Sequence, residues 1–279
     1  MAEITAANVG KLREMTGAGL MDCKKALTEA NGEIDAAVDI LRKKGIATAG
    51  KKGSRAANEG VFVQHVAPGG RLGLLVEINC ETDFVARNDT FKAFCEDVAK
   101  KLAANPAADL EADRIAAVAK IGENILISRH QLIQVSGNGL VAAYIHTGAK
   151  VGVLVEVGAG KEATVASDDF KQLVRDITLQ IAAAHPSVVT RDEIPADVLA
   201  KEKEIAAEQV KNKPPQAIAK IVEGKLEKFY QGQCLIDQGF VKRNSEISVK
   251  EHIGATAKQM GDEITIRRFV RFQVGESPA

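Results

Sequence analysis

Apolar residues in the middle of the chain follow a pattern that occurs twice. Residues 60–66 and 72–78 predict two β-strands, because apolar residues dominate both segments and an Ala-Pro-Gly-Gly turn separates them. A helix is predicted next, because apolar residues then recur at helical spacing until Asn105-Pro106. These positions are Phe91, Phe94, Cys95, Val98 and Leu102.

The same pattern returns at a constant shift of 79 residues. The glycines at positions 60, 69 and 73 recur at 139, 148 and 152, and Leu75-Val76-Glu77 recurs as Leu154-Val155-Glu156. The apolar stripe of the helix also returns, as Phe170, Leu173, Val174, Ile177 and Ile181. So many matches at one shift indicate a duplicated β-β-α unit.

Short amphipathic helices are predicted before this repeat. Thr5 is a suitable N-cap for the first helix, whose apolar face carries Val9, Leu12 and Met15. A second helix follows the Thr-Gly-Ala-Gly turn and ends at Asn31-Gly32, because both residues tolerate left-handed backbone.

A third helix is predicted over residues 33–44, with Gly45 as its C-terminal stop. From Arg42 to Asn58 there are six lysines or arginines and no acidic residue. This stretch has two interpretations, a contact with RNA or phosphate and a solvated flexible tether. We favour the tether, because the run is short and no aromatic residue is interleaved.

The remaining segments predict a helix at residues 110–122 and strands at 125–135 and 263–274. Between Pro195 and Tyr230, two antiparallel helices joined at a Pro-Pro pair form a projecting hairpin. Such a hairpin is more typical of interaction or oligomerisation than of chemistry, so a homodimer through it is one alternative.

The predicted fold class is therefore α+β, in three parts. Residues 1–55 form a three-helix N-terminal domain with a basic linker, and residues 56–137 form the first half of a duplicated core. Residues 138–279 form the second half, which the helical hairpin at 187–231 interrupts.

The charge balance indicates whether the protein is suited to bind nucleic acid. Lys+Arg and Asp+Glu both number 37, so no overall field attracts nucleic acid. Trp is absent and only two Tyr occur, which leaves few aromatic rings for base stacking. Together these features argue against a nucleic-acid partner.

Targeting signals and disulfides are not expected. The sequence opens Met-Ala-Glu-Ile-Thr, without the basic start and apolar stretch of a signal peptide, and no apolar run reaches membrane-spanning length. The four cysteines are scattered, which is typical of buried, reduced thiols. We therefore predict a cytoplasmic protein that does not bind a membrane.

A search for catalytic and cofactor motifs also favours a protein without either. The five histidines show no shared metal-ligand spacing and no accompanying Ser or Cys nucleophile signature. Gly158-Ala159-Gly160-Lys161 follows a strand as a phosphate loop would, but Val155 replaces the first glycine and Glu162 replaces the Mg²⁺-binding hydroxyl. Neither an enzyme nor direct nucleotide binding is predicted, and no cofactor.

The two copies of the repeat diverge after their second strand. Thr82-Asp83-Phe84 in the first copy stands where the second has Lys161-Glu162-Ala163. An ordinary capped turn with Phe84 in the core is the interpretation that the residues alone favour. The alternative is a functional segment, because Ala163 indicates that the scaffold needs no ring at this position.

At these residues the chain resembles the elongation factor Ts family, and the resemblance runs nearly from end to end. It is carried by Leu12-Arg13-Glu14-Met15-Thr16-Gly17-Ala18-Gly19, by Met21-Asp22-Cys23-Lys24-Lys25-Ala26-Leu27 and by Asn79-Cys80-Glu81-Thr82-Asp83-Phe84-Val85-Ala86. Two shorter segments, residues 120–124 and 151–155, are similar to the family as well. Some members continue into a C-terminal helical module, whereas this sequence ends at Ala279, so a contact made by that module is in doubt.

The resemblance implies a ubiquitin-associated-like N-terminal domain, a core of two related α+β halves and an inserted coiled-coil hairpin. It also implies a guanine-nucleotide exchange factor that binds elongation factor Tu·GDP and promotes GDP release. Thr82, Asp83, Phe84 and Val85 match the segment credited with dislodging Mg²⁺ from the nucleotide site of that partner.

Further contacts are implied residue by residue. Arg13, Leu20 and Met21 match positions that touch the GTPase domain of elongation factor Tu, and His146 matches a position that meets another of its domains. Leu20 stands where the family often has Met, an apolar exchange that should be tolerated.

Three other readings remain open. Residues 1–55 alone would carry the activity of a ubiquitin-like or peptide-binding module. An RNA-binding translation protein would use the basic stretch from Arg42 to Arg55, and a scaffold protein would use the hairpin.

Overall fold

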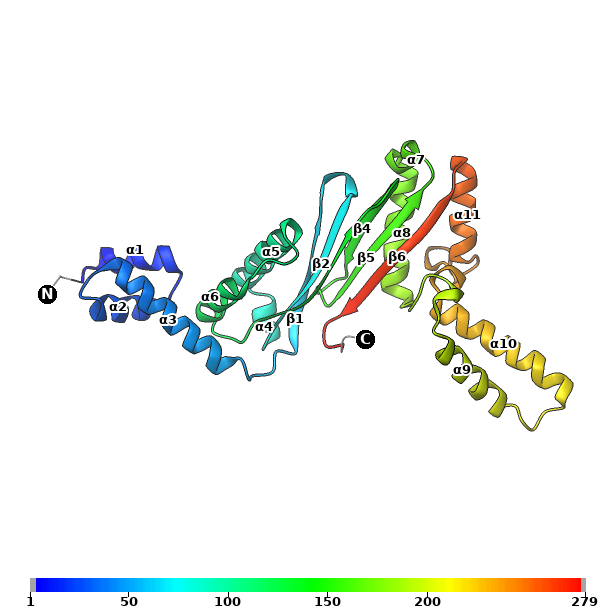
Figure 1. The fold of residues 1–279 in the computed structure, drawn as a ribbon, viewed down its shortest axis with the longest axis horizontal. Coiled ribbons are helices and arrows are strands. Elements are labelled where there is room, and N and C mark those ends of the chain that lie inside the picture. Colours follow the sequence, from blue (N-terminus) through cyan, green and yellow to red (C-terminus); the bar gives the residue numbers. More distant parts are fainter. Residues whose placement is uncertain (1–3, 277–279) are drawn as a thin grey trace.

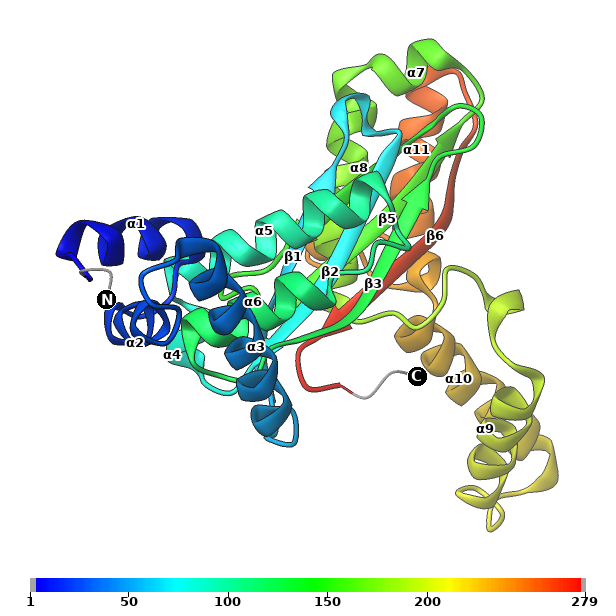
Figure 2. The same ribbon diagram turned by 60° about the vertical axis from the view of Figure 1, so that its left-hand side comes forward.

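The computed structural model describes residues 4–276. The predictions about the two chain ends rest partly on residues outside this range, namely Met1–Glu3 and Ser277–Ala279. The molecule is elongated, with a helical bundle at one end, two sheets in the middle and a projecting helical hairpin (Figures 1 and 2). The predicted α+β class is confirmed. No helix within residues 4–276 has both the length and the apolar character needed to cross a membrane.

The N-terminal bundle consists of three helices with a small core of their own. They are α1 (Ala6–Thr16), α2 (Leu20–Glu29) and α3 (Ile34–Lys52). Thr5 caps α1 as predicted, because its side chain accepts a hydrogen bond from the backbone N–H of Asn8 at 3.2 Å. Leu12 and Leu27 are fully buried in this core. The prediction that Met15 joins them was wrong, since its side chain is 56% exposed.

Helix α3 continues through most of the predicted basic linker. The prediction of a stop at Gly45 was wrong, and so was a flexible tether from residue 42, because the helix runs to Lys52. Gly45 is buried where α3 crosses a later helix, and a Cβ at this position would lie 3.6 Å from Ala119 and from Ile115. The glycine therefore allows the close approach of two helices, which joins the bundle to the core.

The core contains two three-stranded antiparallel sheets with orders β1-β2-β3 and β4-β5-β6. The strands are β1 (Glu59–Val66), β2 (Leu72–Cys80), β3 (Leu126–Gln134), β4 (Gly139–Ile145), β5 (Val151–Ala159) and β6 (Ile264–Gln273). Helices α4 (Asp83–Ala86), α5 (Asp89–Ala104) and α6 (Glu111–Ile121) belong to the first half. Helices α7 (Glu162–Ala166), α8 (Asp168–Ala184) and α11 (Val249–Met260) belong to the second.

The duplicated unit is longer than the sequence pattern indicated. β2 and β5 correspond end to end at the predicted shift of 79. The shift then becomes 139, because α6 and β3 correspond to α11 and β6, and the helix-ending glycines Gly122 and Gly261 are equivalent. Helix α11 was not predicted, although its capping box, Ser248 with Glu251, is a signal present in the sequence.

The two sheets pack face to face through contacts that repeat with the halves exchanged. A Cβ built on Gly73 would lie 2.8 Å from Cδ1 of Leu154, and a Cβ on the equivalent Gly152 would lie 2.7 Å from Cδ1 of Leu75. Each half therefore inserts a buried leucine where the other half has no side chain. Leu75 and Leu154 belong to one buried cluster between the sheets, which also includes Phe62 and Ile133.

The ion pairs of two buried glutamates follow the same exchange. Glu77 pairs with Arg129 at 2.6 Å and Glu156 pairs with Arg268 at 2.8 Å, each within its own sheet. Arg129 also donates to the backbone carbonyl of Gln273, and Arg268 donates to that of Gln134. Because each arginine bonds the edge strand of the opposite half, the halves are tied together at both sides.

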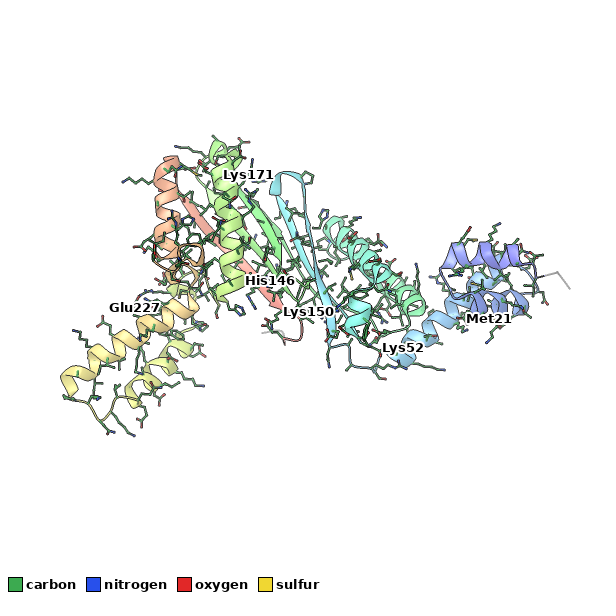
Figure 3. All side chains as sticks on the ribbon, turned by 180° about the vertical axis from the view of Figure 1, so that it is seen from behind. Met21, Lys52, His146, Lys150, Lys171 and Glu227 are labelled. Atoms are coloured by element: carbon green, nitrogen blue, oxygen red, sulfur yellow. The ribbon has the colours of Figure 1, made fainter. Side chains whose placement is uncertain are left out.

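The inserted hairpin consists of α9 (Ala196–Glu208) and α10 (Pro215–Gln233), at the site predicted for it. Arg191, just before α9, pairs with Glu227 on α10 at 2.6 Å and with Asp237 beyond α10 at 2.9 Å (Glu227 is labelled in Figure 3). This double pair fixes the base of the hairpin. Dimerisation through the hairpin stays a prediction. The short 3₁₀ turns are η1 (Pro68–Gly70), η2 (Arg191–Glu193), η3 (Leu235–Asp237) and η4 (Val241–Arg243).

Candidate functional site

The segment where the two copies diverge forms a short helical turn at the end of β2. Thr82 caps this turn, because its hydroxyl accepts a hydrogen bond from the backbone N–H of Val85 at 3.3 Å. Phe84 lies on α4 with 81% of its side chain exposed. The capped turn was therefore predicted correctly, but placing Phe84 in the core was wrong. Aromatic side chains are enriched at protein–protein interfaces, so the exposed ring makes this turn a candidate contact surface.

Glu123, from the loop after α6, holds the turn in place. Its Oε2 accepts the backbone N–H groups of Glu81 and Thr82, each at 3.0 Å, and its Oε1 accepts the Thr82 hydroxyl at 2.6 Å. Hydrogen bonds to a charged group stabilise by about 1.5–3 kcal/mol each. The base of the turn is consequently fixed to the rest of the first half.

A second set of bonds joins this turn to the end of α3. Glu81 accepts the backbone N–H of Asn124 at 2.6 Å and lies 3.5 Å from the guanidinium of Arg55. The buried side chain of Asn124 donates in turn to the carbonyl of Arg55 at 2.8 Å. The turn, the loop after α6 and the segment after α3 thus form one network.

Sequence reasoning gave no role to Glu81, Glu123 or Asn124. The one available signal was an acidic residue directly after the glycine that ends a helix. Its partner Thr82 lies 41 positions away in the chain, a separation that no periodicity reports.

The four predicted residues divide into anchors and displayed groups. Thr82 is bonded as described, and Val85 is partly buried against the core of the first half. Asp83 is 45% exposed and pairs with Arg87 one turn later at 3.0 Å. Asp83 and Phe84 are therefore the side chains that this site presents to the exterior.

The equivalent turn in the second half has the same support without the ring. Asp262 follows Gly261 as Glu123 follows Gly122, and it accepts the backbone N–H of Lys161 at 2.9 Å. Ala163 takes the place of Phe84. The shared scaffold therefore forms without an aromatic side chain at this position, so the fold does not require the ring of Phe84.

The other predicted contact residues lie apart from this turn. Arg13, Leu20 and Met21 are exposed on the N-terminal helices, with Leu20 and Met21 more than half exposed. His146 follows β4 in the second half, where its Nδ1 lies 3.0 Å from the Tyr144 hydroxyl. Figure 3 shows Met21 and His146 at well separated places. The predicted residues thus mark three surfaces rather than one pocket.

The potential metal ligands and the cysteines within residues 4–276 do not form a reactive site. No group of three His, Cys, Asp or Glu side chains there could hold a metal ion. All four cysteines are buried and free. Burial raises the pKa of Cys80 to about 11 and does the same for Cys234, which keeps both thiols protonated at neutral pH.

Comparison with known proteins gives one consistent family. The family model described as Elongation factor TS matches residues 81–276. The chain is 44% identical to Elongation factor Ts of Nautilia profundicola, over 99% of this chain and 94% of that protein. It is 44% identical to the protein of the same name from Trichlorobacter lovleyi, over 98% of this chain and 93% of that one. It is 42% identical to Elongation factor Ts of a Nostoc species, over 99% of this chain and 94% of that protein.

Proposed function

The chain belongs to the elongation factor Ts family, and on that premise we propose that it acts as a guanine-nucleotide exchange factor in translation. It binds elongation factor Tu·GDP, disturbs the Mg²⁺ and phosphate site of that partner, and promotes replacement of GDP by GTP. It acts through protein–protein contact, without catalysing a chemical reaction and without binding nucleotide itself.

One observation carries this proposal, the exposed ring of Phe84 on a turn held by Glu123. An exposed Phe side chain gains about 1.5–3 kcal/mol when it becomes fully buried. Because the turn is already fixed by hydrogen bonds, little of that gain is lost in ordering it. Phe84 is therefore suited to enter the partner as a wedge.

The wedge acts on a site that depends on exact ligand positions. GTPases of this class hold GDP through backbone N–H groups of the phosphate loop and a Mg²⁺ that bridges phosphate and a hydroxyl ligand. A ring inserted between nearby helices of the partner shifts those groups, and Asp83 accepts a hydrogen bond there that keeps the ring in register. Arg13, Leu20, Met21 and His146 provide further contacts with the partner.

Thermodynamic linkage makes the action of the factor reciprocal, so the factor itself sets no direction of exchange. The factor weakens GDP binding by the same ratio by which GDP weakens binding of the factor. The factor opens a route for both nucleotides, so the supply of GTP over GDP determines which one refills the site.

The test is the rate at which elongation factor Tu releases a fluorescent GDP analogue, measured by stopped-flow at saturating factor. We expect the wild-type chain to accelerate release and Phe84→Ala to slow that accelerated rate at least ~10-fold, a loss typical of a central contact residue. Ile46→Ala is the matched control, because Ile46 is an apolar side chain on α3 that is 51% exposed. Release as fast with Phe84→Ala as with Ile46→Ala would falsify the wedge.

A further inference from the structure

A groove lies in the second half near the end of β4, and residues of α8 and of the strands β4, β5 and β6 or adjacent to them line it. It has a volume of about 490 Å³. Leu179 and Ala183 of α8 form an apolar wall, and polar groups come from the surrounding segments (His146 is labelled in Figure 3). These polar residues are Tyr144, His146, His185 and Arg271.

Arg271 is buried in this groove with its donors only partly paired. Its side chain is 8% exposed, and its nearest acidic group within residues 4–276 is Glu276, at 3.6 Å from Nη1. Nη2 donates to His185 Nε2 at 2.9 Å and to the Gln273 amide oxygen at 3.1 Å, while Nε has no acceptor among the described residues. A buried guanidinium that lacks full pairing is costly, and its fork of donors matches a carboxylate.

His185 adds no competing positive charge. Burial lowers its pKa, and the adjacent Arg271 lowers that pKa further, so the ring is neutral at pH 7 and accepts the bond from Nη2. Arg271 is therefore the positive charge at this groove, and the half-exposed Glu276 carries the opposite charge beside it.

The first half shows that the scaffold does not need a cation at the position of Arg271. Val153 of β5 pairs with Arg271, whereas the equivalent Leu74 of β2 pairs with Leu132. His146 donates its backbone N–H to Val151, and the equivalent bond in the first half comes from Ala67. The groove is thus a place where the copies diverge, as the Phe84 turn is.

We propose that this groove binds an acidic side chain of elongation factor Tu, an inference that rests on the proposed function. The carboxylate pairs with the guanidinium of Arg271 and displaces Glu276, which holds that position in the free chain. The Tyr144 hydroxyl and Nδ1 of His146 share a hydrogen bond at 3.0 Å. In the tautomer of His146 that carries its proton on Nε2, this N–H is available to donate to the same carboxylate.

The central test measures binding and exchange separately. Arg271→Leu installs the residue that the first half carries at this position, so the fold is expected to tolerate it. Titration calorimetry of elongation factor Tu·GDP should show Kd raised about 10-fold, a loss typical of a buried charge pair. GDP release at saturating factor should keep its wild-type rate, because the groove binds the partner without acting on Mg²⁺.

Three further variants separate recognition from simple structural loss. Arg271→Lys keeps the charge but loses the fork, so its Kd should fall between those of the wild type and Arg271→Leu. Glu276→Gln removes the internal competitor, so it should bind as tightly as the wild type or more tightly. Lys250→Leu removes one exposed cation from α11 and should leave Kd within twofold of the wild type. Circular dichroism and thermal unfolding check that each variant is folded.

Two results would overturn the proposal. One is an Arg271→Leu variant, folded by these criteria, with a Kd within twofold of the wild type. The other is Glu276→Gln weakening binding as much as Arg271→Leu does, which would assign both residues a structural role. The proposed function fails separately, if the wild-type chain binds elongation factor Tu·GDP but does not accelerate GDP release.

Discussion

The hydroxyl of Thr82 donates a hydrogen bond to the carboxylate of Glu123 over 2.6 Å, across 41 positions of the chain. Thr82 is the first residue of the divergent segment, and Glu123 follows the glycine that ends α6. The position of the exposed ring is therefore set by a residue that does not touch it. This relationship separates the ring, which would enter a partner, from the group that positions it.

Replacing Glu123 should impair both stability and exchange. Glu123→Ala leaves the N–H groups of Glu81 and Thr82 without their acceptor, which costs about 1–3 kcal/mol for partly buried donors. Urea unfolding measures that loss, and the stopped-flow assay should show slower GDP release because the turn is no longer fixed. Glu96→Ala, on the exposed side of α5, is the control. Equal behaviour of the two variants would contradict the positioning role.

The packing between the sheets predicts opposite effects for two glycine substitutions. Gly152→Ala places a methyl group 2.7 Å from Cδ1 of Leu75, so overpacking should lower the free energy of unfolding by about 1–3 kcal/mol. Gly224→Ala lies inside α10 with no atom within 4 Å, and it should raise that free energy by about 0.5–1 kcal/mol. Denaturant titration of both variants gives the comparison, and a destabilisation shared by both would refute the packing argument.

The thiols should resist modification while the chain is folded. All four cysteines are buried, and burial raises the pKa of Cys80 and of Cys234 to about 11, with a larger upward shift at Cys95. The thiolate is the reactive form, so Ellman's reagent at pH 8 should react slowly with native protein. All four thiols should react rapidly in concentrated urea. A rapid reaction of the native protein would contradict the burial described.

Acid should weaken the fold through two histidines. Burial lowers the pKa of His252, which stacks on Phe240 at 4.1 Å, and burial followed by Arg271 lowers that of His185. At His252, nearby Asp176 acts in the opposite direction, while Arg243 and Lys242 reinforce the lowering. Because each folded pKa lies below the unfolded value near 6.5, the unfolded chain binds protons first.

The contribution of these two histidines to the free energy of unfolding should be fully present above pH ~6.5. It should be lost as the pH falls through the lower pKa values of the folded chain. Thermal unfolding between pH 5 and pH 8 measures this slope. His252→Gln should flatten it, whereas His65→Gln should leave it unchanged, since His65 neither stacks on Phe240 nor bonds Arg271. An unaltered slope in His252→Gln would remove His252 from the explanation.

The parts of the fold that could be predicted are those that depend on local spacing. The strands β2 and β5 and the helices α5 and α8 were found because their apolar positions recur at one shift. Helix α11 was missed because the inserted hairpin breaks that shift. The glycine at position 45 was misread as a stop, since its purpose is the approach of α6, which is a tertiary contact.

The candidate sites show the same limit. Divergence between the copies singled out residues 82–84, but only the structure shows that Phe84 faces outward. Arg271 drew no attention because it is one of three arginines in a partly alternating strand, and the sequence does not distinguish it from the other two. Its burial, and the Leu132 that replaces it in the first half, became evident only when the strand pairing was known.

The reciprocal insertion of Leu75 and Leu154 also gives the core a mechanical character. Close-packed layers deform little, so two attachment points carried by opposite halves keep a constant separation. A partner engaged at one point meets the other at a high effective concentration, provided that its own surfaces have matching spacing. The sheet-on-sheet layer would thus fix the separation of the two proposed attachments, so that binding at one favours binding at the other.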